Sequence, residues 1–248
     1  MSRRIALALV IMLCLAGTGG VATAAPFLVV DQGEFDFGYV PQNSTISHTF
    51  HLQNAGDDTL LIHKVVPGCG CTKAPLTKSV LAPGESTEVV IIFSTGQYNG
   101  PVTKRPRLET NETIPSRNLT FRATVVTRPD STYPILVKPY KLDISQFGQK
   151  VRDQMKFSIS NVSDEALALE LISGSNDLFK VSVPEQVAAG RTVEGVVELN
   201  KKALEQSYET SFTLQLNDAS STRFTVPVKR TVQMQSGVGS PGVKAALK

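Results

Sequence analysis

The feature that most restricts the fold of this chain is an internal repeat. Four segments of the first half recur in the second half in the same order, at an offset of 107 (161 − 54) that falls to 106 (190 − 84). Because four matches in one order are hard to produce by chance, they predict two tandem copies of one domain, each of about 100 residues. The matched pairs are 48–54 with 155–161, 57–62 with 164–169, 81–84 with 187–190, and 107–111 with 213–217.

Each copy has the pattern of short β-strands. Apolar residues alternate with polar ones around Phe50 and Phe157, which is typical of a strand with one solvated face. Turn-forming residues separate such segments, and at Pro83-Gly84 we expect a turn in which Gly84 has a positive φ. Because neither sheet could bury its apolar face alone, the pattern predicts an all-β protein of two tandem β-sandwiches.

The chain begins with the pattern of a secretory signal peptide. Arg3 and Arg4 precede an apolar run, and Ala22-Thr23-Ala24 fits the small-x-small cleavage rule. The apolar run, residues 5–16, is too short to cross a bilayer, although an uncleaved anchor is the alternative. We therefore expect an exported protein that is periplasmic or extracellular after cleavage.

The repeat and the composition of the connecting segments predict the domain boundaries. A proline at each end makes the linker semi-stiff, and the last residues have too little apolar content to order themselves. The expected division is a signal peptide at 1–24, a first domain at 25–128, a linker at 129–134, a second domain at 135–233 and a disordered tail at 234–248.

Charge and missing motifs exclude several functions. Removing the signal peptide lowers Lys+Arg from 25 to 23 against 22 Asp+Glu, so the mature chain has a net charge near +1. This balance gives no electrostatic reason to bind nucleic acid or an anionic membrane, and we expect no stable membrane insertion of the mature chain. No Gly-x-Ser-x-Gly elbow, phosphate loop or His-Glu-x-x-His motif occurs, so we expect a protein that is not an enzyme.

The two cysteines of the mature chain are the residues with the clearest chemistry. Cys69 and Cys71 are separated only by Gly70. In an oxidising compartment such thiols tend to pair. In an extended strand their α-carbons would lie roughly 6.5 Å apart, at the far edge of what a disulfide tolerates, so we expect Gly70 to supply a bend or a positive φ. A structural disulfide, a redox-active pair and a soft-metal site all remain open.

A metal at the cysteines would need more ligands, and histidine is the usual one. Two thiolates suit Cu(I) or half a zinc site, and His63 precedes Cys69 by six residues. Copper with Cys69, Cys71 and His63 is therefore the alternative to a protein without a cofactor. The repeat places His48 inward as a hydrogen-bonded core residue, and His51 and His63 toward solvent. Lys64 and Lys73 are either cations that could lower the pKa of one thiol or ordinary solvated lysines.

Motifs in the first copy resemble a known family. They occur in one order over about residues 27–127: Phe35-Asp36-Phe37-Gly38, Phe50-x-Leu52-x-Asn54-x-Gly56, Cys69-Gly70-Cys71-Thr72 and Leu81-x-Pro83-Gly84-Glu85, with a late Asn111. This set resembles a bacterial exported family of unknown function, related to the Hydin and ASH (ASPM, SPD-2, Hydin) domains. The resemblance implies immunoglobulin-like sandwiches and an exported protein, and it supplies no activity. The second copy lacks the cysteines and has Gly174-Ser175-Asn176 in their place.

Two functions follow as hypotheses. The first is an exported, non-catalytic interaction or scaffolding module that binds another envelope or extracellular protein, for example by strand addition at an open sheet edge. The second is thiol–disulfide exchange or Cu(I) handling at Cys69 and Cys71. The basic cluster at 104–107 is either a solvated edge strand or a site for an acidic partner.

Overall fold

The structure is a computed structural model that describes residues 24–128, 130–174 and 177–233. The predicted signal peptide, except Ala24, and the predicted tail lie outside the described residues. Within the described part, the one helical element is a short 3₁₀ turn, η1 (Lys201–Ala203), and no helix there is long and apolar enough to cross a membrane. The rest consists of strands and their connections, which agrees with the predicted all-β fold class.

The first domain is a sandwich of two antiparallel layers. One layer has the strand order β1-β3-β7-β5, and the other contains a sheet of order β10-β9-β4-β6. The predicted alternation is present, because every second residue along β7 is buried: Thr87, Val89, Ile91 and Phe93. The strands are β1 (Leu28–Val30), β3 (Thr45–Asn54), β4 (Leu60–Val66), β5 (Thr72–Lys73), β6 (Val80–Leu81), β7 (Ser86–Ser94), β9 (Arg107–Thr110) and β10 (Ser116–Asn118).

The second domain repeats this arrangement. Its first layer has the order β12-β15-β19-β17, which corresponds to β1-β3-β7-β5. Its other layer contains β18-β16-β20-β21, and a two-stranded sheet β14-β22 lies beside it. The strands are β12 (Ile135–Lys138), β14 (Gln146–Phe147), β15 (Gln154–Asn161), β16 (Leu167–Ser173), β17 (Phe179–Ser182), β18 (Gln186–Val187), β19 (Thr192–Leu199), β20 (Tyr208–Leu216), β21 (Arg223–Arg230) and β22 (Val232–Gln233).

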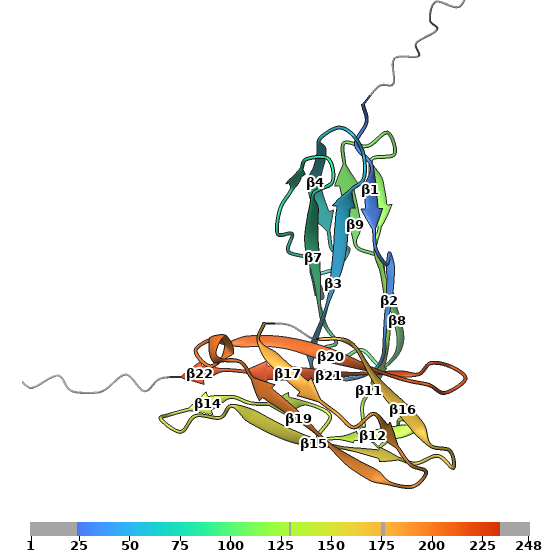
Figure 1. Ribbon diagram of the computed structural model, residues 1–248, viewed down its shortest axis with the longest axis vertical. Coiled ribbons are helices and arrows are strands. Elements are labelled where there is room, and N and C mark those ends of the chain that lie inside the picture. Colours follow the sequence, from blue (N-terminus) through green and yellow to red (C-terminus); the bar gives the residue numbers. More distant parts are fainter. Residues whose placement is uncertain (1–23, 129, 175–176, 234–248) are drawn as a thin grey trace, which may run out of the picture.

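One sheet runs through both domains. Its order is β18-β16-β20-β21-β2-β11-β8, with β13 (Leu142–Asp143) also paired to β21. The first domain contributes β2 (Glu34–Pro41), β8 (Gly100–Lys104) and β11 (Thr120–Val126). The two halves join where β2 pairs in parallel with β21, at Tyr39 and Phe224. Figure 1 shows the result, in which the first sandwich stands roughly upright on the side of the second.

Two separate cores lie on either side of this junction. In the first, Phe37, Phe50, Phe93 and Phe121 are fully buried. In the second, Phe157, Phe179, Phe212 and Phe224 occupy the corresponding interior. Each sandwich therefore buries its own apolar face, and at the junction Tyr39 and Val126 also pack against the second core and Ile172 against the first.

Equivalent hydrogen bonds show that the two copies are the same domain. The buried amide of Asn54 donates to the carbonyls of Asp58 (2.8 Å) and Leu81 (3.0 Å). Asn161, 107 residues later, donates to Glu165 (2.7 Å) and Val187 (3.1 Å). The parallel pair Phe35–Phe121 in β2 and β11 likewise has its counterpart in Leu142–Val228. The structural repeat therefore coincides with the sequence repeat.

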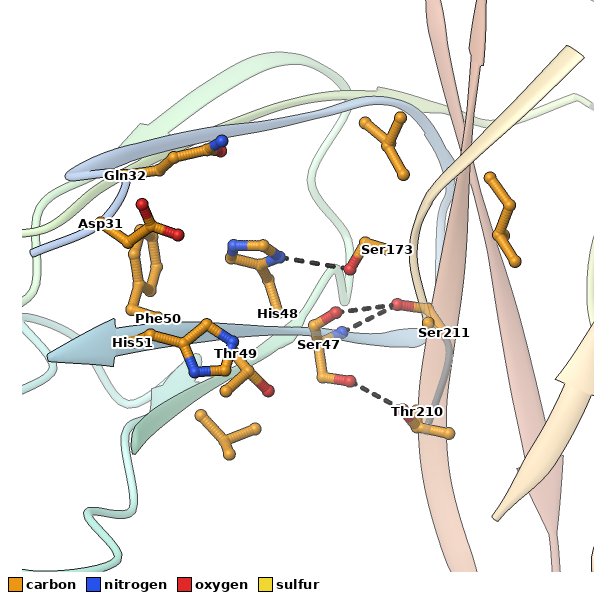
Figure 2. Close-up of a pocket in the computed structure, with 14 residues that line it drawn as sticks. Asp31, Gln32, Ser47, His48, Thr49, Phe50, His51, Ser173, Thr210 and Ser211 are labelled. Carbon is orange, nitrogen blue, oxygen red and sulfur yellow. Dashed lines mark hydrogen bonds between the residues drawn. The ribbon is translucent and has the colours of Figure 1, made fainter. Parts of the chain in front are cut away.

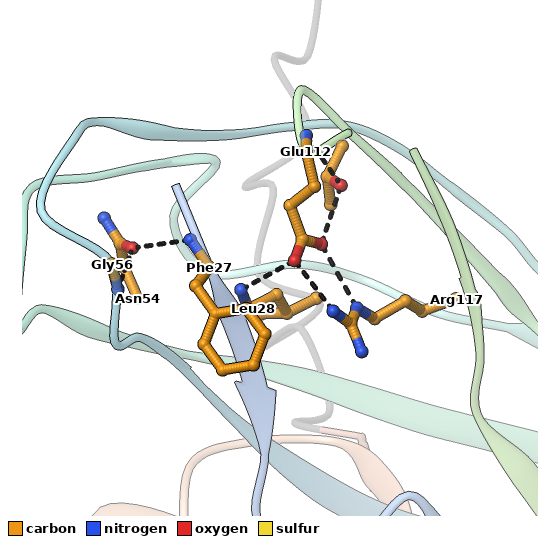
Figure 3. Close-up of polar contacts among 7 residues, drawn as sticks. Phe27, Leu28, Asn54, Gly56, Glu112 and Arg117 are labelled. Atoms are coloured by element: carbon orange, nitrogen blue, oxygen red, sulfur yellow. Dashed lines mark hydrogen bonds and ion pairs between the residues drawn. The ribbon is translucent and has the colours of Figure 1, made fainter. Parts of the chain in front are cut away.

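A buried ion pair closes the end of the first sandwich that lies away from the junction. The Glu112 carboxylate accepts hydrogen bonds from Nη2 and Nε of Arg117 (2.9 and 3.2 Å), from the Leu28 amide (2.9 Å) and from the Thr110 hydroxyl (3.0 Å) (Figure 3). Burial opposes ionisation of Glu112, but these donors outweigh it and hold the pKa below its ordinary value. The contacts tie β1 to the loop between β9 and β10.

Candidate functional site

The cysteine loop begins where β4 leaves its sheet. β4 pairs with β9 as far as Val66, opposite Arg107, and the chain then crosses to the other layer, where Thr72 of β5 pairs with Phe93 of β7. The crossing is a tight turn, in which the Thr72 amide donates to the Cys69 carbonyl (3.3 Å). The Ser94 amide donates to the Cys71 carbonyl (2.9 Å) and fixes the end of the loop.

Cys69 and Cys71 form a disulfide in this loop, with an S–S distance of 2.02 Å. Their α-carbons are 5.3 Å apart, shorter than the extended spacing because the backbone turns between them. Of the two alternatives expected for Gly70, a bend or a positive φ, the structure has the bend, because the chain turns at Gly70 and the positive φ of the loop belongs to Gly68 (83°). Both cysteines are half-buried, and Cys71 packs against the first core.

A tyrosine and a lysine lie against one sulfur of this disulfide. The Tyr98 hydroxyl donates to Sγ of Cys71 (3.5 Å), and Nζ of Lys104 donates to the Tyr98 oxygen (3.0 Å). The Lys104 ammonium also lies 4.7 Å from the centre of the Tyr98 ring, within the range of a cation–π contact. The Thr72 hydroxyl lies 3.3 Å from Sγ of Cys69. The cation linked to the disulfide is thus Lys104, and the expected candidates Lys64 and Lys73 are exposed.

The predicted turn after β6 has the expected residues in place. Gly84 has a φ of 80°, and the Glu85 amide donates to the Ala82 carbonyl (3.0 Å) across Pro83-Gly84. The Glu85 carboxylate accepts from the Ala82 amide (2.8 Å) and from Lys78 (2.6 Å). These contacts close the turn, as the sequence predicted.

The structure does not assemble the expected metal ligands. His63 is exposed on β4, and in the described part of the chain no group of three or more His, Cys, Asp or Glu side chains is placed to hold a metal ion. In addition, the sulfurs of Cys69 and Cys71 are bonded to each other and offer no thiolate until they are reduced. The copper site at Cys69, Cys71 and His63 is therefore not formed in this arrangement.

The segment Phe35-Asp36-Phe37-Gly38 lies at the junction of the two domains. The Thr225 hydroxyl donates to the Phe37 carbonyl (2.6 Å), and Arg223 donates to the Asp36 carbonyl (3.2 Å). Gly38 has a φ of 63°, and a Cβ there would lie 2.0 Å from the Arg223 carbonyl oxygen. Only glycine allows the two backbones to approach this closely.

A polar cleft of about 460 Å³ opens beside this junction, between β3 and the strands β16 and β20 (Figure 2). There the Ser47 amide donates to the Ser211 hydroxyl (3.0 Å), and the Ser47 hydroxyl lies 2.8 Å from that of Thr210. His48 contacts the Ser173 hydroxyl (3.2 Å) through Nδ1. At this cleft the first domain contacts the second through hydroxyls and one imidazole.

His48 is held in its neutral form. Its ring stacks on Phe35 with a centroid distance of 3.5 Å. Burial, followed by the positive fields of His51 and Arg223, lowers the pKa of His48 from 6.5 to about 4. The inward, hydrogen-bonded His48 agrees with the sequence prediction, and His51 and His63 are exposed, as predicted. The partner of His48, however, lies in the other domain.

Several residues of the site could not be found from the sequence. Tyr98 belongs to no motif and Lys104 only to the basic cluster at 104–107, and their link to Cys71 depends on how β7, β8 and the cysteine loop meet. Ser173 and Ser211 are ordinary polar residues in the sequence. Gly38 alone carried a signal, since a glycine inside an apolar strand often marks a close backbone approach.

The strand pairing and the two cores define a protein of two immunoglobulin-like β-sandwiches. Residues 28–125, which span most of the first sandwich, match the family described as "Protein of unknown function (DUF1573)". None of the curated proteins matches the chain.

Solved structures give weak matches to the chain. One is a protein of unknown function from Porphyromonas gingivalis W83, at 13% identity, covering 82% of this chain and 98% of that one, with a TM-score of 0.35. Another is the ASH/PapD-like domain (PapD-like domain 7) of human CEP192, at 12% identity, covering 42% and 87%, with a TM-score of 0.32. The YadV chaperone matches at 12% identity, covering 82% and 98%, with a TM-score of 0.29.

Proposed function

We propose that this protein is an exported, non-catalytic interaction module that binds an extended segment of another envelope or extracellular protein along β8. The observation that carries the proposal is the open edge of this strand. Among the described strands, β8 pairs only with β11, and it is the last strand of the sheet that runs through both domains. An edge of this kind is a template for strand addition.

The orientation of β8 supports backbone recognition on its open side. Pro101 lies opposite Thr124 of β11 but has no N–H to donate to it. This fits a register in which the backbone nitrogen of Pro101 faces away from β11, toward the open side of β8. Thr103, two residues further on, has the same orientation, and its amide is free to meet an incoming strand. Lys104 and the exposed Arg105 follow at once, which favours an acidic partner segment.

The proposal is tested by site-specific photocrosslinking in the exported compartment. A photoreactive residue at Arg105 should yield a discrete adduct with one partner, and the same residue at the remote, exposed Glu185 should not. Thr103→Pro should remove the adduct by blocking the edge, and Thr103→Ala should retain it. Identical adducts from both positions, or an adduct that survives Thr103→Pro, would refute binding along β8.

Thiol–disulfide exchange at Cys69–Cys71 is the second candidate function. It is favoured by the half-buried disulfide, whose Cys71 sulfur accepts a hydrogen bond from Tyr98. The disulfide also lies beside the open edge, because Lys104 of β8 contacts Tyr98. A segment bound along β8 would therefore bring its own cysteine near the disulfide. Copper handling by the same pair would first require reduction of the disulfide.

A capture experiment tests this second function. In the Cys71→Ser variant, the Cys69 thiolate attacks the disulfide of an oxidised partner protein, a mixed disulfide forms and one partner thiolate leaves. No Cys71 thiol is present to resolve this bond, so mixed disulfides should accumulate on Cys69 in the exported compartment. The double variant Cys69→Ser, Cys71→Ser is the control and should capture nothing. If Cys71→Ser also captures nothing, exchange with protein thiols is not the function.

A further inference from the structure

The environments of the two sulfurs differ, and this difference has a chemical consequence. The Thr72 hydroxyl lies near both sulfurs, 3.3 Å from Cys69 and 3.8 Å from Cys71, but the Tyr98 hydroxyl contacts Cys71, which also packs against the first core. An incoming thiolate must approach the attacked sulfur in line with the S–S bond, so the covered sulfur is the harder one to reach. Access alone therefore favours attack at Cys69.

The hydrogen bonds favour the same direction. Attack at Cys69 makes Cys71 the leaving group, and a leaving thiolate departs faster when its charge is stabilised. The Tyr98 hydroxyl already donates to Cys71, and the Lys104 ammonium donates to the Tyr98 oxygen, which makes the hydroxyl a stronger donor. Through the hydrogen bonds from Lys104 to Tyr98 and from Tyr98 to Cys71, a polarised hydroxyl donates to the sulfur on which negative charge would form.

We propose that Tyr98 and Lys104 are positioning residues that direct thiol–disulfide exchange to the sulfur of Cys69 and stabilise Cys71 as the leaving thiolate. This inference rests on the second candidate function. The thiolate of a partner protein attacks Cys69, a new S–S bond forms to the partner, and the electron pair of the broken Cys69–Cys71 bond stays on Cys71. A second thiolate of the same dithiol partner then attacks the partner's sulfur in the mixed disulfide and releases Cys69 as a thiolate. The partner loses two electrons and this protein gains them.

Reduced glutathione serves as the probe of this direction. The oxidised protein is mixed with glutathione, quenched in acid, alkylated with N-ethylmaleimide and digested with trypsin. Both cysteines then lie on one peptide, residues 65–73, and fragmentation at Gly70 separates them. Glutathione should be found on Cys69 and the maleimide on Cys71, with an excess of about tenfold, since one charge-assisted hydrogen bond has about that effect. Glutathione mainly on Cys71 would overturn the proposal.

A pH profile separates positioning from a merely structural role. In Cys69→Ser, the remaining thiol of Cys71 should react with iodoacetamide at a lower midpoint pH than the remaining thiol of Cys71→Ser. Tyr98→Phe should raise the midpoint in Cys69→Ser only, Lys104→Gln should raise it less, and Tyr133→Phe, an exposed tyrosine of the second domain, should not change it. Equal midpoints, or no response to Tyr98→Phe, would contradict the proposal.

The experiments distinguish a wrong direction of attack from the absence of thiol–disulfide exchange as a function. If Cys71→Ser captures no protein while glutathione still attaches to Cys69, the direction of attack stands and the biological exchange is refuted. If Cys71→Ser captures proteins while glutathione attaches mainly to Cys71 of the oxidised wild type, exchange stands and the proposed direction is refuted.

Discussion

At the scale of single residues, a few buried polar groups hold each sandwich in register. Asn54 is the clearest example, because its carbonyl oxygen accepts from the Gly56 and Phe27 amides (3.1 and 3.4 Å) and its nitrogen donates to two carbonyls. It connects β1, the turn after β3 and the end of β6. Asn161 does the same in the second domain, so the repeat preserves a hydrogen-bonding device as well as an apolar pattern.

Replacement of Asn54 should therefore be costly. Asn54→Ala leaves several buried backbone groups without partners and should lower the free energy of unfolding by about 2 to 4 kcal/mol. Chemical denaturation measures this loss. Asn111→Ala is the control, because Asn111 also bonds to backbone but is exposed, so water can replace it. Equal losses for the two variants would contradict the role given to Asn54.

His48 should make stability depend on pH in a defined window. Its pKa is about 4 in the folded protein and near 6.5 when unfolded, so the unfolded state binds more protons between these values. Stability is therefore highest above pH 6.5 and falls as the pH drops toward 4, by up to about 3 kcal/mol. His48→Gln should remove this fall, and the exposed His63→Gln should leave it unchanged, in denaturation series between pH 7 and 4. A fall that persists in His48→Gln would contradict the assignment.

Glu112 should also make the protein less stable on acidification, at a lower pH than His48 does. Its folded pKa is below the ordinary value, so its stabilisation is present above about pH 4.5 and is lost as the pH falls through the folded pKa. Glu112→Gln should be less stable than the wild type at pH 7 and should lose less stability on acidification. Glu88→Gln, an exposed carboxylate on β7, is the comparison and should behave as the wild type does. A wild-type acid response in Glu112→Gln would exclude this role.

At the scale of elements, β2 is the strand that joins the domains. It pairs with β11 of its own sandwich and with β21 of the other, and Gly38 lies at the crossing. Its counterpart in the second domain is divided into two short strands, β13 and β14, which pair in parallel with β21 and β22.

Gly38→Ala should weaken this crossing more than backbone strain alone explains. Gly190 has the same φ of 63°, but a Cβ there meets nothing within 4 Å. Gly190→Ala should therefore show only the cost of a left-handed alanine, about 1 kcal/mol. Gly38→Ala adds an overlap with the Arg223 carbonyl and should lose clearly more free energy of unfolding in the same denaturation assay. Equal losses would mean that the close approach of β2 to β21 is absent in solution.

The internal repeat and the alternation of apolar and polar residues could be predicted from the sequence. Contacts between side chains that lie far apart in the sequence could not. The alternation around Phe50 is a local pattern, and the match of Asn54 to Asn161 comes from the repeat, so both can be read from the sequence. The contact of Ser47 with Ser211 joins positions 164 apart and involves side chains with no special pattern. The sequence left a structural disulfide, a redox-active pair and a metal site open, because pairing depends on a turn at Gly70 that the spacing of Cys69 and Cys71 alone does not reveal.

At the scale of the whole molecule, the two sandwiches form one body because they share a sheet and a hydrogen-bonded junction. The Tyr140 hydroxyl donates to the Tyr39 carbonyl (2.6 Å), and Lys141 donates to the Asn43 carbonyl (3.1 Å), so the junction also includes the segment just after the linker. The linker itself is fixed by Thr132, which is buried and donates to the Ile135 carbonyl (2.7 Å). A fixed angle would present the open edge of β8 and the disulfide in one orientation.

A distance measurement between the domains tests this account most directly. Spin labels on cysteines introduced at the exposed Ser86 and Glu185, in a Cys69→Ser, Cys71→Ser background, report the distance between the two sandwiches by electron double resonance. A shared sheet predicts a single narrow distribution, which Gly38→Ala should broaden. A broad or two-peaked distribution in the background protein would show that the domains move independently and would contradict the account.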